Sequence, residues 1–212
     1  SIASYFQDKQ LAEHELLLNL IATHDGISVQ GVSDFLESAR IEQIIASMVE
    51  KGGLVSYGQT KGEKIPYEIN ITYYDAINSH NDESDEAVER FIASQAFMIA
   101  LKGIPGMYIH SLLATHNDSK AVKGSGIKRM INRSHIKWHH LEEALAEPLS
   151  RRSLCFHGLM KMFEAIRDVP AFSPYASQSI LESDPRLFVV ERKWNGSLIT
   201  SVINVSDDEV QA

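Results

Sequence analysis

Short apolar runs that end in polar residues and glycine mark the first part of the chain. Leu16–Ile21 is a nearly continuous apolar run, and Ala22-Thr23-His24-Asp25-Gly26 follows it directly. A run of this length predicts a strand buried on both faces, which ends at a functional rim. The alternative is the last turn of a helix capped by Gly26.

A helix and a hairpin are predicted next. Ser33 has the chemistry of an N-cap, apolar residues at helical spacing continue to Lys51, and Gly52-Gly53 ends the pattern. In Leu54–Ile77 the polar, glycine-containing stretch Gly58–Lys64 lies between alternating, β-branched or aromatic runs. This arrangement predicts a hairpin-like excursion from the main body of the fold.

An α/β fold is indicated by the order of the elements that follow. Val88–Leu101 predicts a strongly apolar helix ended by Gly103, and Met107–His110 predicts a short buried strand. The predicted order is a strand, a long loop with an insertion, a helix, a short turn and a second strand. This order is typical of a parallel sheet with helices packed outside it. We therefore expect an α/β body.

The pattern changes toward the C-terminus. A long polar loop is predicted over Ala114–His140, followed by helices near Leu141–Leu149 and Ser153–Asp168. Two antiparallel strands are then predicted over Arg186–Arg192 and Ser197–Asn204, because the Asn-Gly pair between them is a strong hairpin signal. The α/β body is thus expected to give way to the start of an all-β domain.

Composition narrows the range of partners. The 212 residues carry 20 Lys and Arg against 28 Asp and Glu, a net charge of −8, so we expect no nucleic-acid partner. No apolar run approaches the ~20 residues of a membrane span, so we expect no membrane partner. The single Cys155 is predicted to be a core thiol, and its lack of a disulfide partner favours a reducing, cytoplasmic location.

The candidate chemistry begins with His24 and Asp25. A carboxylate and an imidazole just beyond a buried strand project into the cleft where many α/β enzymes hold catalytic groups. His-Asp-Gly is also ordinary turn chemistry, so the alternative is a structural turn. Arg133 lies in a locally basic loop, which is either a solvated segment or the source of a guanidinium that pairs with a carboxylate and binds sugar or phosphate oxygens.

Other polar and aromatic residues are less specific. Tyr67-Glu68 in the hairpin either covers a sheet face or lines a sugar subsite. His135, His139 and His140 are expected to be surface residues, because adjacent histidines do not easily face one ion and no Cys or HExxH partner is present. No P-loop, GxGxxG, GxSxG or CxxC motif occurs, so we expect no metal and no cofactor.

Several stretches together carry a resemblance to a known family. They are Asn19–Ile27, Pro66–Tyr74, Gly103–Tyr108, Leu113–Asp118 and Ile131–Arg133, in this order. The chain resembles the later part of the sucrose phosphorylase branch of the α-amylase superfamily, glycoside hydrolase family 13. The resemblance implies the last two β/α units of a (β/α)8 barrel over residues 1–175, with a long insertion at about 27–85, and the beginning of a β-sandwich domain over 176–212.

The resemblance also implies a reaction and roles for five residues. The family converts an α-glucoside and inorganic phosphate to α-glucose 1-phosphate with retention of configuration, by way of a glucosyl-enzyme. Asp25 matches the acidic residue that stabilises the transition state, and His24 its sugar-binding neighbour. Arg133 matches an arginine that closes the glucose pocket by pairing with an aspartate from the early barrel. Tyr67 and Glu68 match a mobile loop facing the acceptor or phosphate.

Two departures from the family pattern affect these expectations. The nucleophile and the acid/base, expected on earlier strands, have no counterpart in the chain. We therefore expect the 212 residues alone to be inactive and to need the N-terminal half of the barrel or self-association. Glu68 stands where sucrose-specific members usually carry Gln, and members acting on glucosylglycerate or sucrose 6'-phosphate resemble this chain more closely here. The substrate is expected to be an α-glucoside of the sucrose or glucosylglycerate class, with the acceptor left open. An amylase-type hydrolase or transglucosidase, or a non-catalytic interaction module, are the alternatives.

Overall fold

The computed structural model describes residues 15–60, 62–79 and 81–210. Contacts divide the chain into two compact units. The first unit takes the described part of Ser1–Leu20 together with Ile92–Gly106 and Gly158–Ala212, and the second consists of Ile21–Phe91 and Met107–His157. Two long helices, α4 (Asp85–Ala100) and α8 (Arg151–Arg167), contribute residues to both units.

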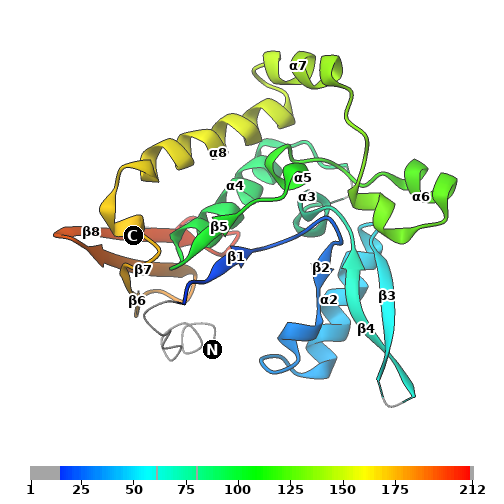
Figure 1. Cartoon of the computed structure of the whole chain (residues 1–212), viewed down its shortest axis with the longest axis horizontal. Helices are drawn as coiled ribbons and strands as arrows, with labels where there is room; N and C mark the ends of the chain where they lie inside the picture. The colour runs from blue at the N-terminus through cyan, green and yellow to red at the C-terminus, as the bar shows by residue number, and fades with distance from the viewer. Residues whose placement is uncertain (1–14, 61, 80, 211–212) are drawn as a thin grey trace. The chain divides into compact units, whose positions relative to one another are not determined.

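The described residues form a mixture of helices and strands (Figure 1). The strands are β1 (Leu18–Leu20), β2 (Ile27–Ser28), β3 (Leu54–Thr60), β4 (Glu63–Asn70), β5 (Ile104–Gly106), β6 (Ser177–Leu181), β7 (Leu187–Trp194) and β8 (Ser197–Asn204). The other helices are α2 (Ser38–Glu50), α3 (Tyr73–Ile77), α5 (Ile109–Leu112), α6 (Ser119–Ser125) and α7 (Trp138–Ala146), with 3₁₀ helices η1 (Gln30–Val32), η2 (Lys128–Asn132) and η3 (Pro170–Phe172). The mixed α/β character expected from the sequence is confirmed.

In the first unit, β1 and β5 form a parallel pair. The amide of Ile104 donates to the carbonyl of Leu17 at 2.8 Å, and the Asn19 side chain donates to the carbonyls of Leu101 and Lys102. A Cβ on Gly106 would lie 2.5 Å from a terminal methyl group of Leu20, so a larger residue there would displace the Leu20 side chain. The apolar run before His24 therefore contains a strand and not the end of a helix. The expectation that this strand is buried on both faces is wrong, because Leu18 and Leu20 are 63% and 48% exposed.

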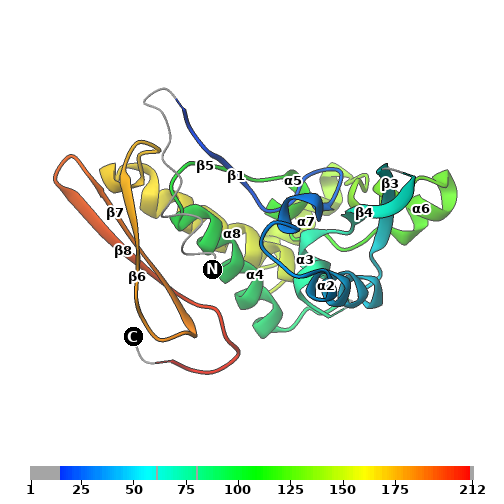
Figure 2. The same cartoon turned by 90° about the horizontal axis from the view of Figure 1, so that it is seen from below.

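The C-terminal part of the first unit is a three-stranded antiparallel sheet in the order β6-β7-β8 (Figure 2). Asn195 and Gly196 both have positive φ, at 46° and 78°, which is the conformation of the tight turn that matches strand twist. Burial of Val190 and Arg192 anchors β7. The Arg192 guanidinium donates to the carbonyls of Ala100 and Ser173, and its burial lowers its pKa to about 10.

The second unit contains a sheet in the order β2-β4-β3, with β4 between its two antiparallel neighbours. Its core consists of Val29, Ile69, Ile71 and Ala76, and the partly buried Ile45 and Met48 of α2 pack against it. Burying Val29, Ile69 and Ile71 contributes about 1.5–3 kcal/mol each. The predicted hairpin is thus present, and the helix before it, α2, packs against the sheet.

Three local predictions are corrected. The helix predicted from Ser33 begins instead at Ser38, because the Ser33 hydroxyl donates back to the carbonyl of Gln30 in a 3₁₀ turn. The strand predicted over Met107–His110 is instead Ile104–Gly106, where the backbone pairs with β1. The predicted long loop over Ala114–His140 contains α6 and η2. The β5 error arises where a tertiary pairing outweighs local propensity, whereas the Ser33 error arises from a local hydrogen bond.

Candidate functional site

The site begins with a tight turn in the second unit. Thr23 and Gly26 exchange two backbone hydrogen bonds of 3.1 Å, which leaves His24 and Asp25 at the tip of the turn. Gly26 has a φ of +125°, and a Cβ there would lie 2.2 Å from the carbonyl oxygen of Ile69. Any other residue would be strained and would clash with β4. Gly26 therefore fixes the turn against the sheet.

Side chains from two distant segments hold the backbone of this turn. The Asn70 amide on β4 donates to the carbonyl of Asp25 at 2.7 Å. The Asn132 amide, at the end of η2, donates to the carbonyl of Thr23 at 2.7 Å. Both amides are buried, so their hydrogen bonds are costly to leave unmade. The turn is thus positioned by its surroundings as well as by its own hydrogen bonds.

Two arginines approach one oxygen of Asp25. Nη2 of Arg133 lies 2.5 Å from Oδ1, and Nη1 of Arg129 lies 3.3 Å from the same atom. Nε of Arg133 also donates to the carbonyl of His24 at 3.0 Å, which ties the guanidinium to the turn. No described residue donates a hydrogen bond to Oδ2 of Asp25. The carboxylate is therefore held by one oxygen and presents the other.

Arg129 connects Asp25 with the hairpin. Its Nε and Nη2 donate to Oε1 and Oε2 of Glu68 at 3.1 and 3.0 Å, a bidentate pair. Its Nη2 also lies 3.4 Å from the hydroxyl of Tyr67. The hydrogen bond to Glu68 raises the pKa of Arg129. Glu68 is buried and accepts a second hydrogen bond from the Asn70 amide, so its negative charge is compensated on two sides.

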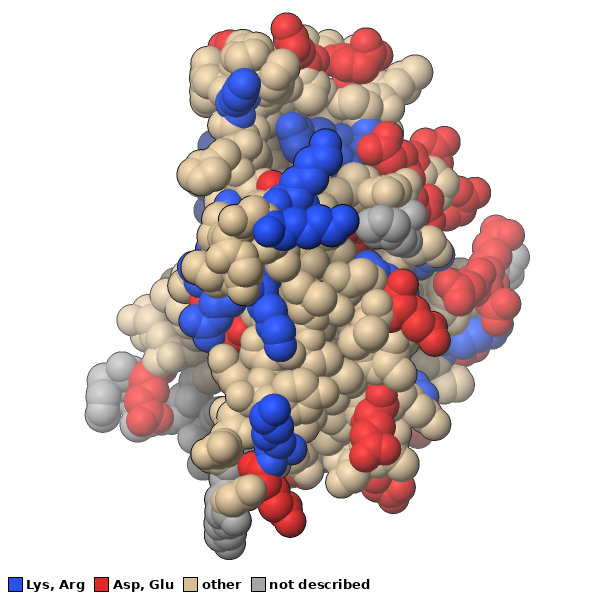
Figure 3. All heavy atoms as spheres, turned by 90° about the vertical axis from the view of Figure 1, so that its right-hand side faces the viewer, with Lys and Arg blue, Asp and Glu red and all other residues tan. Residues whose placement is uncertain are grey.

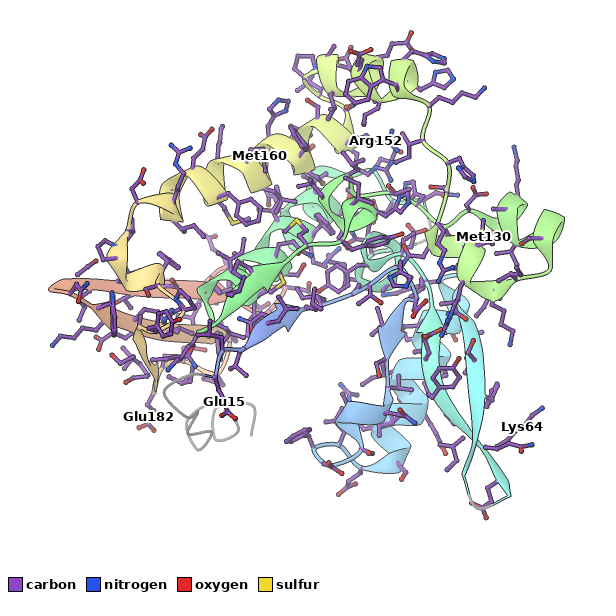
Figure 4. The ribbon with its side chains drawn as sticks, in the orientation of Figure 1. Glu15, Lys64, Met130, Arg152, Met160 and Glu182 are labelled. Carbon is purple, nitrogen blue, oxygen red and sulfur yellow. The ribbon has the colours of Figure 1, made fainter. Side chains whose placement is uncertain are left out.

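The structure brings all five residues predicted from the sequence into one place. Asp25 and His24 lie on the turn, Arg133 directly follows η2, and Tyr67 and Glu68 lie on β4. His24 is 63% exposed, and its ring lies edge-on to Tyr108 at 6.4 Å. We call these five residues together with Arg129 the Asp25 site. Figure 4 labels Met130, the residue of η2 beside Arg129.

The sequence interpretation missed two contributors to the site. Arg129 belongs to the basic loop that also carries Arg133, and its position four residues before Arg133 is a signal that both arginines serve one site. Tyr108 supports the site through the end of η2, because its hydroxyl donates to the carbonyl of Asn132 at 2.8 Å. Burial raises the pKa of Tyr108. Among the described residues, the carboxylate that pairs with Arg133 is that of Asp25.

The surroundings of the remaining cysteine and histidine candidates indicate structural roles. Cys155 is fully buried in α8, and burial raises its pKa to about 12, so the thiol is unreactive. His139 and His140 stack on each other at 4.0 Å, and His140 lies 3.4 Å from Glu143. Within residues 15–60, 62–79 and 81–210, no cluster of three His, Cys, Asp or Glu side chains is arranged to hold a metal ion.

The sequence and fold of the chain match parts of known proteins. The chain is 36% identical over 193 residues to the glucosylglycerate phosphorylase of Spirochaeta thermophila, an alignment that covers 90% of this chain and 33% of the relative. It is 30% identical over 145 residues to the sucrose phosphorylase of Agrobacterium vitis, covering 64% of this chain and 28% of the relative. This chain is homologous to a segment of the glucosylglycerate and sucrose phosphorylases.

A solved structure shows the same fold. The crystal structure of sucrose 6F-phosphate phosphorylase from Thermoanaerobacter thermosaccharolyticum matches with a TM-score of 0.71 at 23% identity, covering 86% of this chain and 34% of that one. No family model matches the chain. The chain spans about one third of the length of these relatives. The resemblance to the sucrose phosphorylase branch is thereby confirmed, for a segment of the family's length.

Among the described helices, none is both long enough and apolar enough to cross a membrane.

Proposed function

We propose that this chain forms the last two β/α units of a (β/α)8 catalytic barrel, followed by the beginning of an all-β domain. The parallel β1–β5 pair and the C-terminal antiparallel sheet support this assignment. Two strands cannot close a barrel of eight, so the remaining strands belong to a preceding segment or to another chain. The proposed boundary near residue 175 lies just before β6.

We further propose that the protein is a retaining α-glucoside phosphorylase. In that reaction a carboxylate attacks the anomeric carbon while a second carboxyl group protonates the leaving oxygen. Phosphate then attacks the glucosyl-enzyme, releases the carboxylate, and leaves as α-glucose 1-phosphate. The nucleophile and the acid/base belong to the part of the barrel outside these 212 residues, so this chain by itself is inactive in our proposal.

The observation that supports this function best is how Asp25 is held. Its Oδ1 is fixed by Arg129 and Arg133, while Oδ2 receives no hydrogen bond from a described residue. Oδ2 is therefore able to accept hydrogen bonds from sugar hydroxyls. These hydrogen bonds strengthen as positive charge develops on the ring, which lowers the barrier of both displacement steps. The exposed His24 beside it binds a hydroxyl of the same ring.

We propose that the acceptor is anionic or rich in hydroxyl groups. Whether Glu68 repels an anionic acceptor depends on its pairing with Arg129. An isolated glutamate would repel an anionic acceptor, but Glu68 is engaged by both donors of Arg129 and by Asn70. Arg129 and Arg133 together balance Asp25 and Glu68. The site is thus close to neutral and tolerates a carboxylate acceptor such as the glycerate in the names of several relatives.

The test is a comparison of two substitutions in the protein that spans the family's length. Asp25→Asn removes the charge but not the shape, and we expect kcat for phosphate-dependent formation of α-glucose 1-phosphate to fall by about a thousandfold. Asp184→Asn is the matched control, because Asp184 also accepts a hydrogen bond from an arginine, Arg186, at an exposed position. It should leave kcat unchanged.

Three results would overturn parts of the proposal. Near-normal turnover in Asp25→Asn removes Asp25 from the mechanism. Release of free glucose without a need for phosphate identifies a hydrolase instead of a phosphorylase. Measurable formation of α-glucose 1-phosphate by the 212 residues alone contradicts the proposed need for residues outside the chain.

A further inference from the structure

A second polar cavity lies in the same unit and shares no residue with the Asp25 site. It has a volume of about 450 Å³ and is lined by residues that follow α5, begin α6 and begin α8. The charged and hydroxyl side chains among its lining are His116, Asp118, Ser119, Lys120, Ser134, Arg151 and Arg152, with Thr115 beside them. Figure 4 labels Arg152 at the first turn of α8.

The floor of this cavity is rigid. Nδ1 of His116 lies 2.5 Å from Oδ1 of the buried Asp75, and the amide of Asn117 donates to the other oxygen at 2.7 Å. The Asn117 side chain in turn accepts from Thr72 and donates to the carbonyl of Lys51. Because both Asp75 oxygens are engaged in this way, the imidazole is fixed with Nε2 as its remaining polar atom.

Several buried donors at the cavity have no acceptor among the described residues. They are Nε2 of His116, Nε and Nη1 of Arg151, and Nε of Arg152. The Arg151 side chain is only 10% exposed, and its guanidinium lies over the ring of Tyr74 at 5.1 Å. Burying a guanidinium with unpaired donors costs several kcal/mol of folding free energy unless a hydrogen-bond acceptor is supplied. These atoms therefore require an acceptor.

The acidic groups nearby do not supply that partner. Oε1 of Glu83 lies 3.5 Å from His116 Nε2 and 3.8 Å from Arg151 Nη2, but Glu83 is 64% exposed and solvent weakens both contacts. The carboxylate of Asp118 accepts from the amide of Ala121 as the cap of α6. Burial, and to a smaller extent the charge of Arg151, lower the pKa of Arg152.

We propose that this cavity binds a phosphate group, either as the free ion or as a phosphate ester. Arg151 and Arg152 line the cavity together with His116 and Lys120. A tetrahedral dianion is able to accept from all of them at once, whereas a single carboxylate offers too few lone pairs. The Ser119 and Ser134 hydroxyls add donors. On the face that carries α6 and the β3–β4 hairpin, Lys and Arg side chains gather toward the middle (Figure 3).

The experiment is a calorimetric titration of the purified protein with inorganic phosphate and, separately, with glycerol 3-phosphate. We expect saturable binding of one or both at constant ionic strength. Arg151→Lys keeps the positive charge but loses the unpaired planar donors, and it should weaken binding by about tenfold. Lys120→Gln, at an exposed position, should weaken binding by about threefold without affecting folding.

The controls separate this cavity from the Asp25 site. Lys123→Gln on the same helix should leave the affinity unchanged. Arg129→Gln affects only phosphate that binds at the Asp25 site as a substrate, so binding at this cavity should persist. Stronger binding of the ester than of the ion assigns a phosphorylated metabolite, and binding of the ion alone assigns inorganic phosphate. The proposal is overturned if neither probe binds, if Arg151→Lys and Lys120→Gln both bind like the wild type, or if Arg129→Gln abolishes binding instead.

Discussion

Two tight turns of this protein each contain a glycine with positive φ, and the glycine has a different role in each. In the β7–β8 hairpin, Gly196 has a φ of +78° and open space where a Cβ would lie. In the turn that carries Asp25, Gly26 has a φ of +125° and the Ile69 carbonyl where a Cβ would lie. Gly196 only allows the backbone conformation of its turn, whereas Gly26 also allows the turn that carries Asp25 to lie directly against the sheet. The difference indicates that the geometry of the Asp25 turn is specified by its surroundings.

The largest expected effect on the free energy of unfolding comes from replacing the glycine of each turn with alanine. Gly26→Ala should lower the free energy of unfolding by about 3 kcal/mol or more, because backbone strain and a backbone clash act together. Gly196→Ala should cost about 1 kcal/mol, because only the unfavourable φ remains. Denaturant unfolding of both variants measures the two changes. Equal costs would show that the Asp25 turn is no more constrained than an ordinary hairpin.

A smaller effect is expected where the arginine bridge meets the hairpin. Glu68→Gln keeps the shape of the side chain but leaves Arg129 with one charged partner, Asp25, instead of two. The site then becomes more positive, so the ratio of kcat/KM for glycerate to that for fructose as acceptors should rise by about fivefold. The ratio is measured in the synthetic direction with α-glucose 1-phosphate. An unchanged ratio would mean that this hairpin does not face the acceptor.

The smallest effect concerns acid sensitivity in the second unit. Burial, with a contribution from Arg152, lowers the pKa of His110 below its ordinary value of 6.5. The unfolded chain then binds a proton more readily than the folded chain, so stability is full above pH 6.5 and is lost as the pH falls through the folded pKa. His110→Gln should flatten the pH dependence of the unfolding midpoint in this range. A variant that keeps the wild-type slope would assign the acid sensitivity to other groups.

The sequence predicts the two turns better than it predicts their surroundings. Asn195-Gly196 is a local signal, and the hairpin forms where it is predicted. His24-Asp25-Gly26 after an apolar run also locates the carboxylate correctly. The strand Ile104–Gly106 was missed because its backbone pairs with Leu18–Leu20, far away in the sequence, while the adjacent Met107–His110 has the stronger strand propensity.

Arg129 illustrates what the sequence does not contain. Lys120, Lys123, Lys128, Arg129 and Arg133 all lie within one basic segment, and their spacing does not distinguish them. The 3₁₀ turns of η2 place Arg129 toward Asp25 and Glu68, whereas Lys128 donates to the carbonyl of Val55. That choice depends on how η2 packs against β4 and the Asp25 turn, which is a tertiary property. The paired Arg151 and Arg152 at the phosphate cavity were missed for the same reason.

The most direct test of the central claim is a double-mutant cycle between Asp25 and Arg133, measured as kcat/KM in the protein of family length. If the arginine acts by holding the carboxylate, Asp25→Asn and Arg133→Lys should be non-additive by about 1–3 kcal/mol, because losing either partner already disrupts the unit. Circular dichroism of each variant confirms that the fold is retained. Strictly additive losses would contradict the account, since Arg133 would then contribute independently of the carboxylate that it contacts.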